Sequence, residues 1–220
     1  MALVAARNEQ QRLPATLAAL RRSLPGARVW LADDASTDDT AAIGERHGAC
    51  VVSTRTHSGK GAAMTLAARR ALESGAAEAT VLLCDGDLGA SALHLAELVA
   101  IVQRGEAEIA VGAFALRRGG GFGLTVGFAR LALARAPGAR ARAPLSGQRA
   151  LRAGALGSLL PFADGFGMEL AMTLDAHRAG MRIVERELPL EHREHGRDVA
   201  GFVHRGRQLR DIARAYARRR

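Results

Sequence analysis

The sequence predicts an α/β domain in which a mostly parallel sheet is covered on both faces by helices. Three observations support this. Short apolar runs alternate along the chain with segments whose apolar residues recur at helical spacing. Several of these runs end in polar turns, as strands do at the ligand edge of a parallel sheet. The length, 220 residues, suits one domain with a substantial core.

The chain begins with a predicted strand and an amphipathic helix. Residues 2–6 (ALVAA) are apolar and end at Arg7, which suits a first strand rather than a signal peptide. Apolar residues spaced by three and four positions share one face of a helix. The next segment shows this spacing at Leu13, Leu17, Leu20 and Leu24. Pro25 and Gly26 are expected to end that helix.

A second strand and helix follow. Residues 29–37 (VWLADDAST) predict a strand that runs into a polar turn. Either Ser36 or Thr37 is expected to cap the next helix. That helix would carry Asp38 and Asp39 in its first turn, where negative charge is favoured by the helix dipole.

The alternation continues to about residue 114. The same reasoning predicts a strand at 50–54, a helix at 59–75, a strand at 80–85, a helix at 91–105 capped by Ser91, and a strand at 107–114. Strands and helices in this order favour parallel pairing, because each helix returns the chain to the starting edge of the sheet. We therefore expect the polar turns after the strands to lie together.

The pattern is looser in the second half of the chain. It predicts a glycine-rich loop at 117–123, a helix at 124–136, a short strand with a turn within 142–156, a helix at 164–180, a strand at 181–192 and a basic tail at 199–220. No repeat or linker interrupts these segments. The prediction is therefore a single domain.

Composition narrows the function classes. A net charge of +9 favours an anionic partner such as a nucleotide, a phospholipid surface or nucleic acid. Aromatic residues make up 4% of the chain, which leaves few platforms for stacking single-stranded nucleic acid. No apolar run approaches the ~20 residues that cross a bilayer, so we expect a cytoplasmic protein. Cys50 and Cys84 are expected to be buried, reduced thiols.

Two carboxylates, those of Asp85 and Asp87, lie at the end of the predicted strand at 80–85. Side chains two positions apart on an extended chain point the same way, so both can face one ion. Mg²⁺ and Mn²⁺ take oxygen ligands and often share their coordination with substrate phosphates. The alternative is an Asp-Gly turn in which one aspartate caps the next helix. The expected position at the ligand edge favours the metal site.

Two further polar stretches are expected at the same edge. A carboxylate of Asp33 or Asp34 can accept hydrogen bonds from a base or a ribose, although this pattern alone favours a turn leading into a helix. Lys60 and Gly61 open a predicted helix, where backbone N–H groups and an ammonium favour an anion. Lys60 is the single lysine in the chain, which favours a functional role over a solvent-exposed turn.

Several familiar motifs are missing. The chain has no Walker A spacing, no G-x-S-x-G elbow and no G-x-G-x-x-G after the first strand, which argues against a hydrolase or a dinucleotide-binding enzyme. The spacing of Cys and His matches no zinc pattern. The segment 192–197 (HREHGR) suits either a phosphate-facing loop or a solvated charged loop.

Taken together, the ordered segments resemble family 2 glycosyltransferases of the GT-A fold. The motifs are VAARNEQQRLPATLAAL, VWLADDASTDDT, GKGAAMTLAARRAL, VLLCDGDL, PLSGQRALR, DGFGMELAMTL and MRIVERELPLEHREHGR. They are most similar to the branches that resemble dolichol-phosphate mannose synthase and glucosyl-3-phosphoglycerate synthase. The resemblance implies one GT-A domain over 1–220, with a nucleotide-binding half (1–114), an acceptor half (115–198) and a basic amphipathic tail (199–220).

The resemblance also implies a role for each candidate residue. Asp85 and Asp87 would hold Mg²⁺ or Mn²⁺ against the diphosphate of a nucleotide sugar, and Asp87 is counted among the catalytic residues. Glu169 would be the general base toward a hydroxyl acceptor, with Asp164 as the second candidate. The remaining residues would contact donor or acceptor: Arg7, Asn8, Glu9, Asp33 and Asp34 at the nucleoside, Lys60 and Gly61 beside it, Ser146, Gly147, Gln148 and Arg149 at the sugar and acceptor, and Arg193 and Arg197 at the diphosphate.

The implied function is an inverting, metal-dependent transfer of a sugar to a phosphate or hydroxyl acceptor, either polyprenyl phosphate or a small molecule. Two alternatives stay open from the residues: a nucleotidyltransferase that makes nucleotide sugars, and a non-enzymatic binder of anionic lipid or nucleic acid. For the leading function no nucleic-acid partner is expected and a homodimer is left open. The basic tail would lie either on anionic lipid at the inner membrane face or on the domain's own core.

Overall fold

The computed structural model describes residues 1–75, 80–115, 123–135, 141–191, 213–214 and 216–217. Its centre is a seven-stranded sheet with the order β3-β2-β1-β4-β6-β5-β7. The strands are β1 (Ala2–Ala6), β2 (Val29–Asp33), β3 (Cys50–Ser53), β4 (Thr80–Asp85), β5 (Ile109–Phe114), β6 (Arg149–Arg152) and β7 (Ile183–Leu188). β6 runs antiparallel to β4 and β5, and the other pairs are parallel. The predicted α/β class with a mostly parallel sheet is confirmed.

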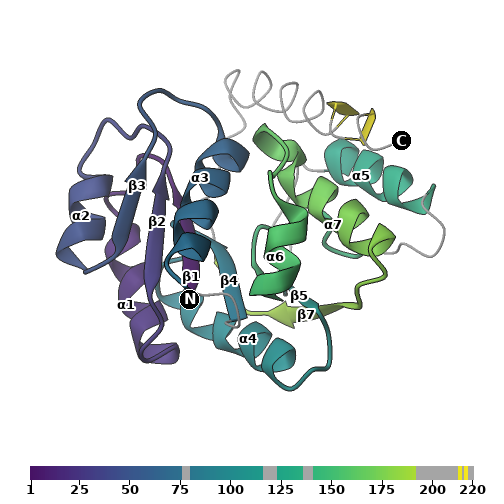
Figure 1. Cartoon of the computed structure of the whole chain (residues 1–220), viewed down its shortest axis with the longest axis horizontal. Helices are drawn as coiled ribbons and strands as arrows, with labels where there is room; N and C mark the ends of the chain where they lie inside the picture. Colours follow the sequence, from purple (N-terminus) through teal and green to yellow (C-terminus); the bar gives the residue numbers. More distant parts are fainter. Residues whose placement is uncertain (76–79, 116–122, 136–140, 192–212, 215, 218–220) are drawn as a thin grey trace.

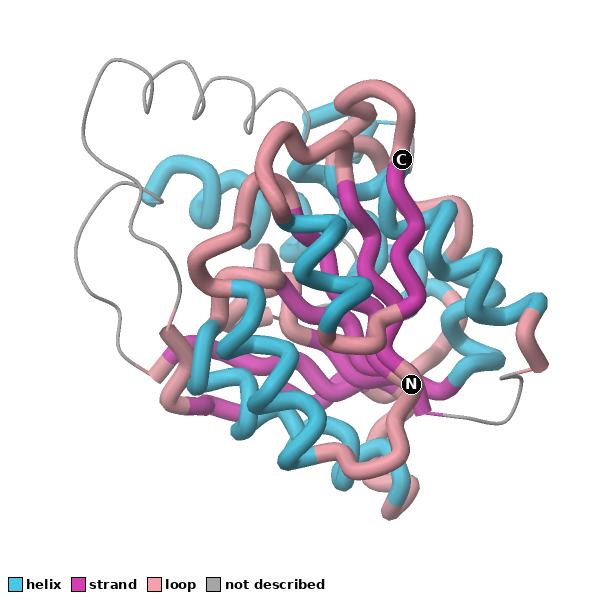
Figure 2. The backbone as a smooth tube through the Cα atoms, turned by 90° about the vertical axis from the view of Figure 1, so that its left-hand side faces the viewer, coloured by secondary structure: helices cyan, strands magenta, loops and turns pink. Residues whose placement is uncertain are grey.

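Helices cover both faces of this sheet (Figures 1 and 2). They are α1 (Leu13–Ser23), α2 (Thr40–Arg46), α3 (Lys60–Glu73), α4 (Ala96–Gln103), α5 (Gly123–Ala134), α6 (Ala153–Leu159) and α7 (Met168–Arg178), with 3₁₀ turns η1 (Gly89–Leu95) and η2 (Gly165–Gly167). In Figure 1, β1–β3 and α1–α3 form the purple-to-blue half, beside the green half with α6 and α7. Figure 2 shows the strands through the middle of the molecule, with helices on either side.

The two cores follow from the alternation of side chains along each strand. In β4, Leu82 and Cys84 pack with α1 and α4, whereas Val81 and Leu83 pack with α3, α6 and α7. Successive side chains of a strand point to opposite faces, so a strand buried on both faces is apolar throughout. The continuous apolar run at 81–84 is therefore the signature of a central strand. A third, smaller cluster joins α5 and α7, and Tyr216 from the tail packs against it.

One predicted helix start is wrong. α2 begins at Thr40, and no side chain caps it. Ser36 and Thr37 bind the loop after β1 instead: the hydroxyl of Ser36 accepts a hydrogen bond from the Asn8 backbone N–H (3.0 Å), and the Thr37 N–H donates to Asn8 Oδ1 (2.8 Å). A cap residue must offer its side chain to its own helix. Here the Ser36 hydroxyl and the Thr37 N–H bind Asn8 in the loop after β1 instead. Sequence periodicity does not reveal such a contact between two loops.

Two other local predictions need correction. The helix expected over 91–105 begins as η1, and the Ser91 hydroxyl donates to the Leu88 carbonyl (2.7 Å) inside that turn rather than capping α4. The segment after β6 forms α6, where only a turn was expected. Its glycines, Gly154 and Gly157, lower intrinsic helix propensity, and the helix exists because it buries Leu156 in the core.

One of the two predictions about the cysteines is confirmed and the other is wrong. Both cysteines are free thiols, and Cys84 is buried as expected. Cys50 is exposed instead, because it starts β3, which is an edge strand of the sheet. None of the helices in the described ranges is long and apolar enough to cross a membrane.

Candidate active site

Three polar loops meet at the carboxyl edge of the sheet. They follow the neighbouring strands β2, β1 and β4, with β1 in the middle. The strand register places Ala6 opposite Asp33 and Ala5 opposite Asp85, so the strands end at the same level. Ligands of open α/β sheets bind beyond this edge. The predicted gathering of the residues after these strands is therefore observed.

The loop after β1 is tied to the loop after β2. Asn8 adopts a left-handed backbone conformation (φ 56°), which Asn tolerates better than most residues, and its side-chain oxygen accepts the Thr37 N–H. The Glu9 N–H donates to the Thr40 hydroxyl (2.8 Å). A cavity of about 470 Å³ is lined by Asn8, Glu9, Gln10, Gln11, Arg12 and Asp38. Two of the predicted nucleoside residues, Asn8 and Glu9, thus line a concave surface.

Asp33 and Asp34 have different surroundings. Asp33 is buried, and its Oδ1 accepts a hydrogen bond from the Ser36 N–H (3.2 Å). Asp34 points into the loop before α3, where it accepts hydrogen bonds from the Ser58 and Gly59 N–H groups (2.8 and 2.9 Å) and contacts His57 Nδ1 (2.7 Å). Asp34 was expected at the nucleoside. Its carboxylate instead anchors the segment that leads into Lys60.

The pKa of Asp34 reflects these contacts. Burial would raise it, but the Ser58 N–H and the charge and hydrogen bond of His57 outweigh burial, so the pKa lies below its usual value. A carboxyl whose pKa is lowered by folding stabilises the protein above its unfolded pKa of ~3.9. That contribution is lost as the pH falls toward the folded value.

We therefore expect Asp34→Asn to destabilise the protein at neutral pH and less so in acid. The loss at pH 7 should be about 1–2 kcal/mol, because an amide accepts the two N–H groups less well than a carboxylate does. Urea unfolding of both proteins at pH 7 and near pH 3.5 measures it. A difference in unfolding free energy that stays the same at both pH values would contradict this role.

Lys60 is the first residue of α3 and lies between two carboxylates. Its Nζ is 2.6 Å from Asp85 Oδ1 and 2.7 Å from Glu169 Oε1. Burial would lower the pKa of Lys60, but the charges of Asp85 and Glu169 raise it well above its usual value. The Lys60 side chain is 27% exposed, so it can be reached from the site. The structure thus gives Asp85 a positive neighbour within the chain.

The Ser146–Gln148 segment holds Asp85 from the other side. Gln148 Nε2 donates to Asp85 Oδ2 (2.6 Å), and Gln148 Oε1 accepts the Asp85 N–H (3.1 Å). A side chain at Gly147 would clash with Lys60 Nζ and lie 3.0 Å from Asp85 Oδ2. Ser146 donates to the Gly112 carbonyl (2.5 Å), which fixes the segment to β5. These residues orient Asp85 and leave room for the ammonium.

Arg149 does not border the site as expected. It is 1% exposed, and its guanidinium donates to the carbonyls of Pro144 and Ser146 and to the Thr173 hydroxyl. Burial lowers the pKa of Arg149 to about 10, against the attraction of Glu169. The side chain connects the loop before β6 with α7, the helix that carries Glu169. Arg149 therefore stabilises the loop that carries Ser146 and its packing against α7.

Gly61 allows a close contact between α3 and the segment before α7. A Cβ at this position would clash with the Ala163 carbonyl oxygen and lie 2.9 Å from the carbonyl carbon. The same contact places Asp164, an exposed residue, next to the start of α3. The backbone of Asp164 therefore lies close to Gly61, the residue that follows Lys60.

The turn that carries Asp87 is held by Thr16, which the sequence analysis did not identify. The Thr16 hydroxyl donates to the Gly86 carbonyl and accepts the Gly89 N–H, both at 2.8 Å. Thr16 lies on the apolar face of α1 among buried leucines, and a polar residue there was the signal for such a role. His57, whose Nδ1 contacts Asp34, was also not predicted, because nothing in the neighbouring sequence indicates this contact.

The residues at this edge fit a divalent cation that is shared with a substrate. Within the described ranges no three Cys, His, Asp or Glu side chains are grouped to hold a metal on their own. Asp85 and Asp87 supply two carboxylates at the sheet edge. Mg²⁺ commonly binds through one or two carboxylates together with substrate phosphates and waters. The donor set therefore suits a metal that arrives with a phosphate-bearing ligand.

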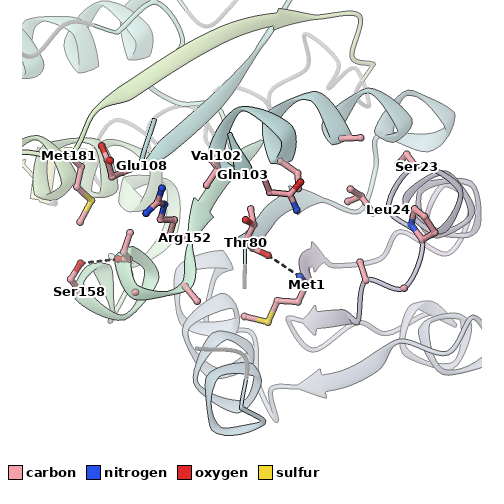
Figure 3. A pocket seen from close by; sticks show the side chains of 18 residues that line it. Met1, Ser23, Leu24, Thr80, Val102, Gln103, Glu108, Arg152, Ser158 and Met181 are labelled. Atoms are coloured by element: carbon pink, nitrogen blue, oxygen red, sulfur yellow. Dashed lines mark hydrogen bonds between the residues drawn. The ribbon is translucent and has the colours of Figure 1, made fainter. Parts of the chain in front are cut away.

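A second cavity among the described residues lies away from this edge. It has a volume of about 1200 Å³ and is surrounded by residues at the opposite edge of the sheet, among them Met1, Thr80 and Arg152 (Figure 3). Met1 and Thr80 precede or begin the strands whose other ends carry the acidic loops. It is thus separate from the candidate site. Arg193 and Arg197, predicted at the diphosphate, lie outside the described residues, as do the loop at 117–122 and most of the tail.

Comparisons with known proteins agree with the geometry. Residues 2–142 match the family model described as glycosyl transferase family 2. No curated protein sequence matches the chain. Two similar solved structures are glucosyl-3-phosphoglycerate synthase of Mycobacterium tuberculosis, one with Mn²⁺, UDP-glucose and phosphoglyceric acid (26% identity, TM-score 0.79, covering 99% of this chain and 78% of that one). The other holds Mn²⁺, UDP and phosphoglyceric acid (25%, 0.78, 99% and 77%).

Proposed function

The chain belongs to glycosyl transferase family 2, and from that premise we propose that it transfers a sugar from a UDP-sugar to a phosphate-bearing acceptor, with Mg²⁺ or Mn²⁺ at Asp85 and Asp87. It is a glycosyltransferase, which replaces the nucleotidyltransferase and non-enzymatic alternatives. The observation that carries the proposal is the meeting of Asp85, Lys60 and Glu169 at the carboxyl edge of the sheet.

The proposed donor site lies over the loops after β1 and β2. The cavity lined by Asn8 and Glu9 suits a nucleoside, and Arg7 and Asp33 would also contact it. Uridine is the base we propose, because the similar structures hold UDP or UDP-glucose. Arg193 and Arg197 would reach the diphosphate from the segment after β7. Asp34 would support this site because its carboxylate holds the Ser58 and Gly59 N–H groups, and Gly61 would do so because it lets α3 approach Ala163.

The proposed chemistry follows from the charges at the edge. A divalent cation at Asp85 and Asp87 would neutralise charge that builds on the departing diphosphate. Glu169 would accept the proton of a hydroxyl acceptor, with Asp164 as the second candidate. In the structure Glu169 Oε1 lies 2.7 Å from Lys60 Nζ. Inversion by a single displacement is the outcome that we propose. A base on the acceptor side is needed because the attacking hydroxyl loses its proton as the bond forms.

A small phosphate-bearing acceptor is favoured over polyprenyl phosphate. The similar structures hold phosphoglyceric acid, and one, at 24% identity, holds glycerol 3-phosphate. Residues 115–198 would form the acceptor half and residues 1–114 the donor half. With polyprenyl phosphate as acceptor, the basic tail at 199–220 would lie on anionic lipid at the inner membrane face.

A transfer assay tests the proposal. Purified protein is incubated with UDP-glucose or GDP-mannose, with and without Mn²⁺, and with 3-phosphoglycerate, glycerol 3-phosphate or polyprenyl phosphate in detergent. We expect UDP release and a glycosylated small phosphate only with UDP-glucose and metal. The ¹H coupling of the new anomeric proton reports inversion or retention, and retention would rule out the single displacement. No transfer and no UDP binding under any condition would refute the proposed function.

A further inference from the structure

The position of Lys60 leads to an inference that rests on the proposed metal site. We propose that Lys60 is a positioning residue that makes metal binding depend on the donor diphosphate. Without the donor, its ammonium holds the Asp85 carboxylate and opposes a cation there. When the diphosphate binds, the ammonium is drawn to it, and Asp85 becomes available to the metal. Metal and donor would then be taken up together.

The ammonium is held in place by several parts of the fold. It lies 2.6 Å from Asp85 Oδ1 and 2.7 Å from Glu169 Oε1, and these carboxylates come from β4 and α7. Asp34 fixes the backbone directly before it, through the N–H groups of Ser58 and Gly59. The space beside Nζ exists because Gly147 has no side chain. The contact with Asp85 is therefore part of the fold rather than a chance pairing of surface side chains.

A metal and the ammonium compete for the same carboxylate. Asp85 Oδ2 is engaged by Gln148, and Oδ1 faces Lys60. A divalent cation on Asp85 would lie within a few ångströms of a like charge, where repulsion is strong in a partly buried site. The four-carbon stem of lysine lets the ammonium turn elsewhere, and at 27% exposure it is not enclosed. A diphosphate supplies the negative charge that attracts both cations.

The consequence is a measurable coupling. If the diphosphate removes Lys60 from Asp85, then UDP raises the affinity for Mn²⁺, and Mn²⁺ raises the affinity for UDP by the same factor. Lys60→Met removes the competing charge, so the variant should bind Mn²⁺ alone more tightly. The same variant should show a smaller effect of UDP on Mn²⁺ binding.

The experiment titrates Mn²⁺ into the protein by calorimetry or by the electron paramagnetic resonance signal of free Mn²⁺, with and without saturating UDP. We expect Lys60→Met to bind Mn²⁺ alone about tenfold more tightly than wild type. The factor by which UDP raises the Mn²⁺ affinity should be about tenfold smaller in this variant than in wild type. Lys60→Arg keeps the charge and should keep most of the coupling. Arg55→Met removes an exposed positive charge five residues away and should change Mn²⁺ affinity less than about threefold.

Each outcome decides the proposal. Unchanged or weaker Mn²⁺ binding by folded Lys60→Met would overturn it, as would an equal gain in Arg55→Met. If Lys60→Met does not fold by circular dichroism, Lys60→Gln takes its place. Wild-type coupling below about threefold overturns the inference without any variant. Failure of wild type to bind UDP, with or without Mn²⁺, would instead count against the proposed function.

Discussion

Replacement of Asp87 by alanine is expected to lower kcat/KM for sugar transfer by at least about a thousandfold, which corresponds to about 4 kcal/mol of transition-state stabilisation. The physical reason is that Asp85 and Asp87 supply the two carboxylates proposed to hold the cation against the leaving diphosphate. The protein should still fold, because the Asp87 side chain is only partly buried and Thr16 holds the turn through backbone groups.

The measurement is the initial rate of UDP release over a range of Mn²⁺ concentrations. Asp39→Ala is a matched control, because Asp39 is an exposed aspartate at the start of α2 and carries no proposed role at the site. We expect the control to keep activity within about twofold and the Asp87 variant to need far more Mn²⁺. Activity of the Asp87 variant within tenfold of wild type, with the same Mn²⁺ dependence, would be incompatible with a metal ligand.

Replacement of Gly61 by alanine is expected to have the largest effect on stability, a loss of about 3 kcal/mol or more in the free energy of unfolding. The added methyl would clash with the Ala163 carbonyl oxygen and approach the Asp164 Cα to 3.4 Å. These are backbone atoms, so relief requires α3 to move away from the segment before α7. The same movement would separate Lys60 from Glu169.

Gly157→Ala is the control for this prediction. Gly157 lies in the exposed face of α6, and a Cβ there would meet nothing within 4 Å. Because alanine is the better helix former, this change should stabilise the protein by about 0.5–1 kcal/mol. Urea unfolding of the two variants should therefore give shifts of opposite sign. A Gly61→Ala protein as stable as wild type would mean that α3 does not pack as described.

Much of the fold could be predicted because its signals are local. The strand at 80–85 has the bounds expected from its apolar run, and α1 follows the leucine spacing that begins at Leu13. The edge on which the acidic loops gather also followed from local pattern, since parallel strands bring their carboxyl ends together. Local pattern failed where a neighbouring loop took the hydrogen bonds of a cap, as with Ser36 and Thr37.

The partners of the site residues could not be predicted in this way. The sequence indicated that Lys60 and Glu169 matter, but not that they meet across 109 positions of the chain. It placed Arg149 at the acceptor, whereas the packing of β6 against α7 buries the guanidinium beneath the loop. Contacts of this kind depend on how helices pack on the sheet, which periodicity does not encode.

The sequence by itself therefore determined the fold class and the edge at which the chemistry is expected, because apolar periodicity and the position of polar turns are properties of short segments. The family was indicated separately, by the resemblance of its ordered motifs. The tertiary structure alone decided which charges face one another. Asp85 is held by Gln148 and Lys60, and Lys60 by Glu169, because a glycine at 147 leaves space and a glycine at 61 lets two elements touch. Side chains from distant segments acquire a shared function only when packing brings them within hydrogen-bond distance.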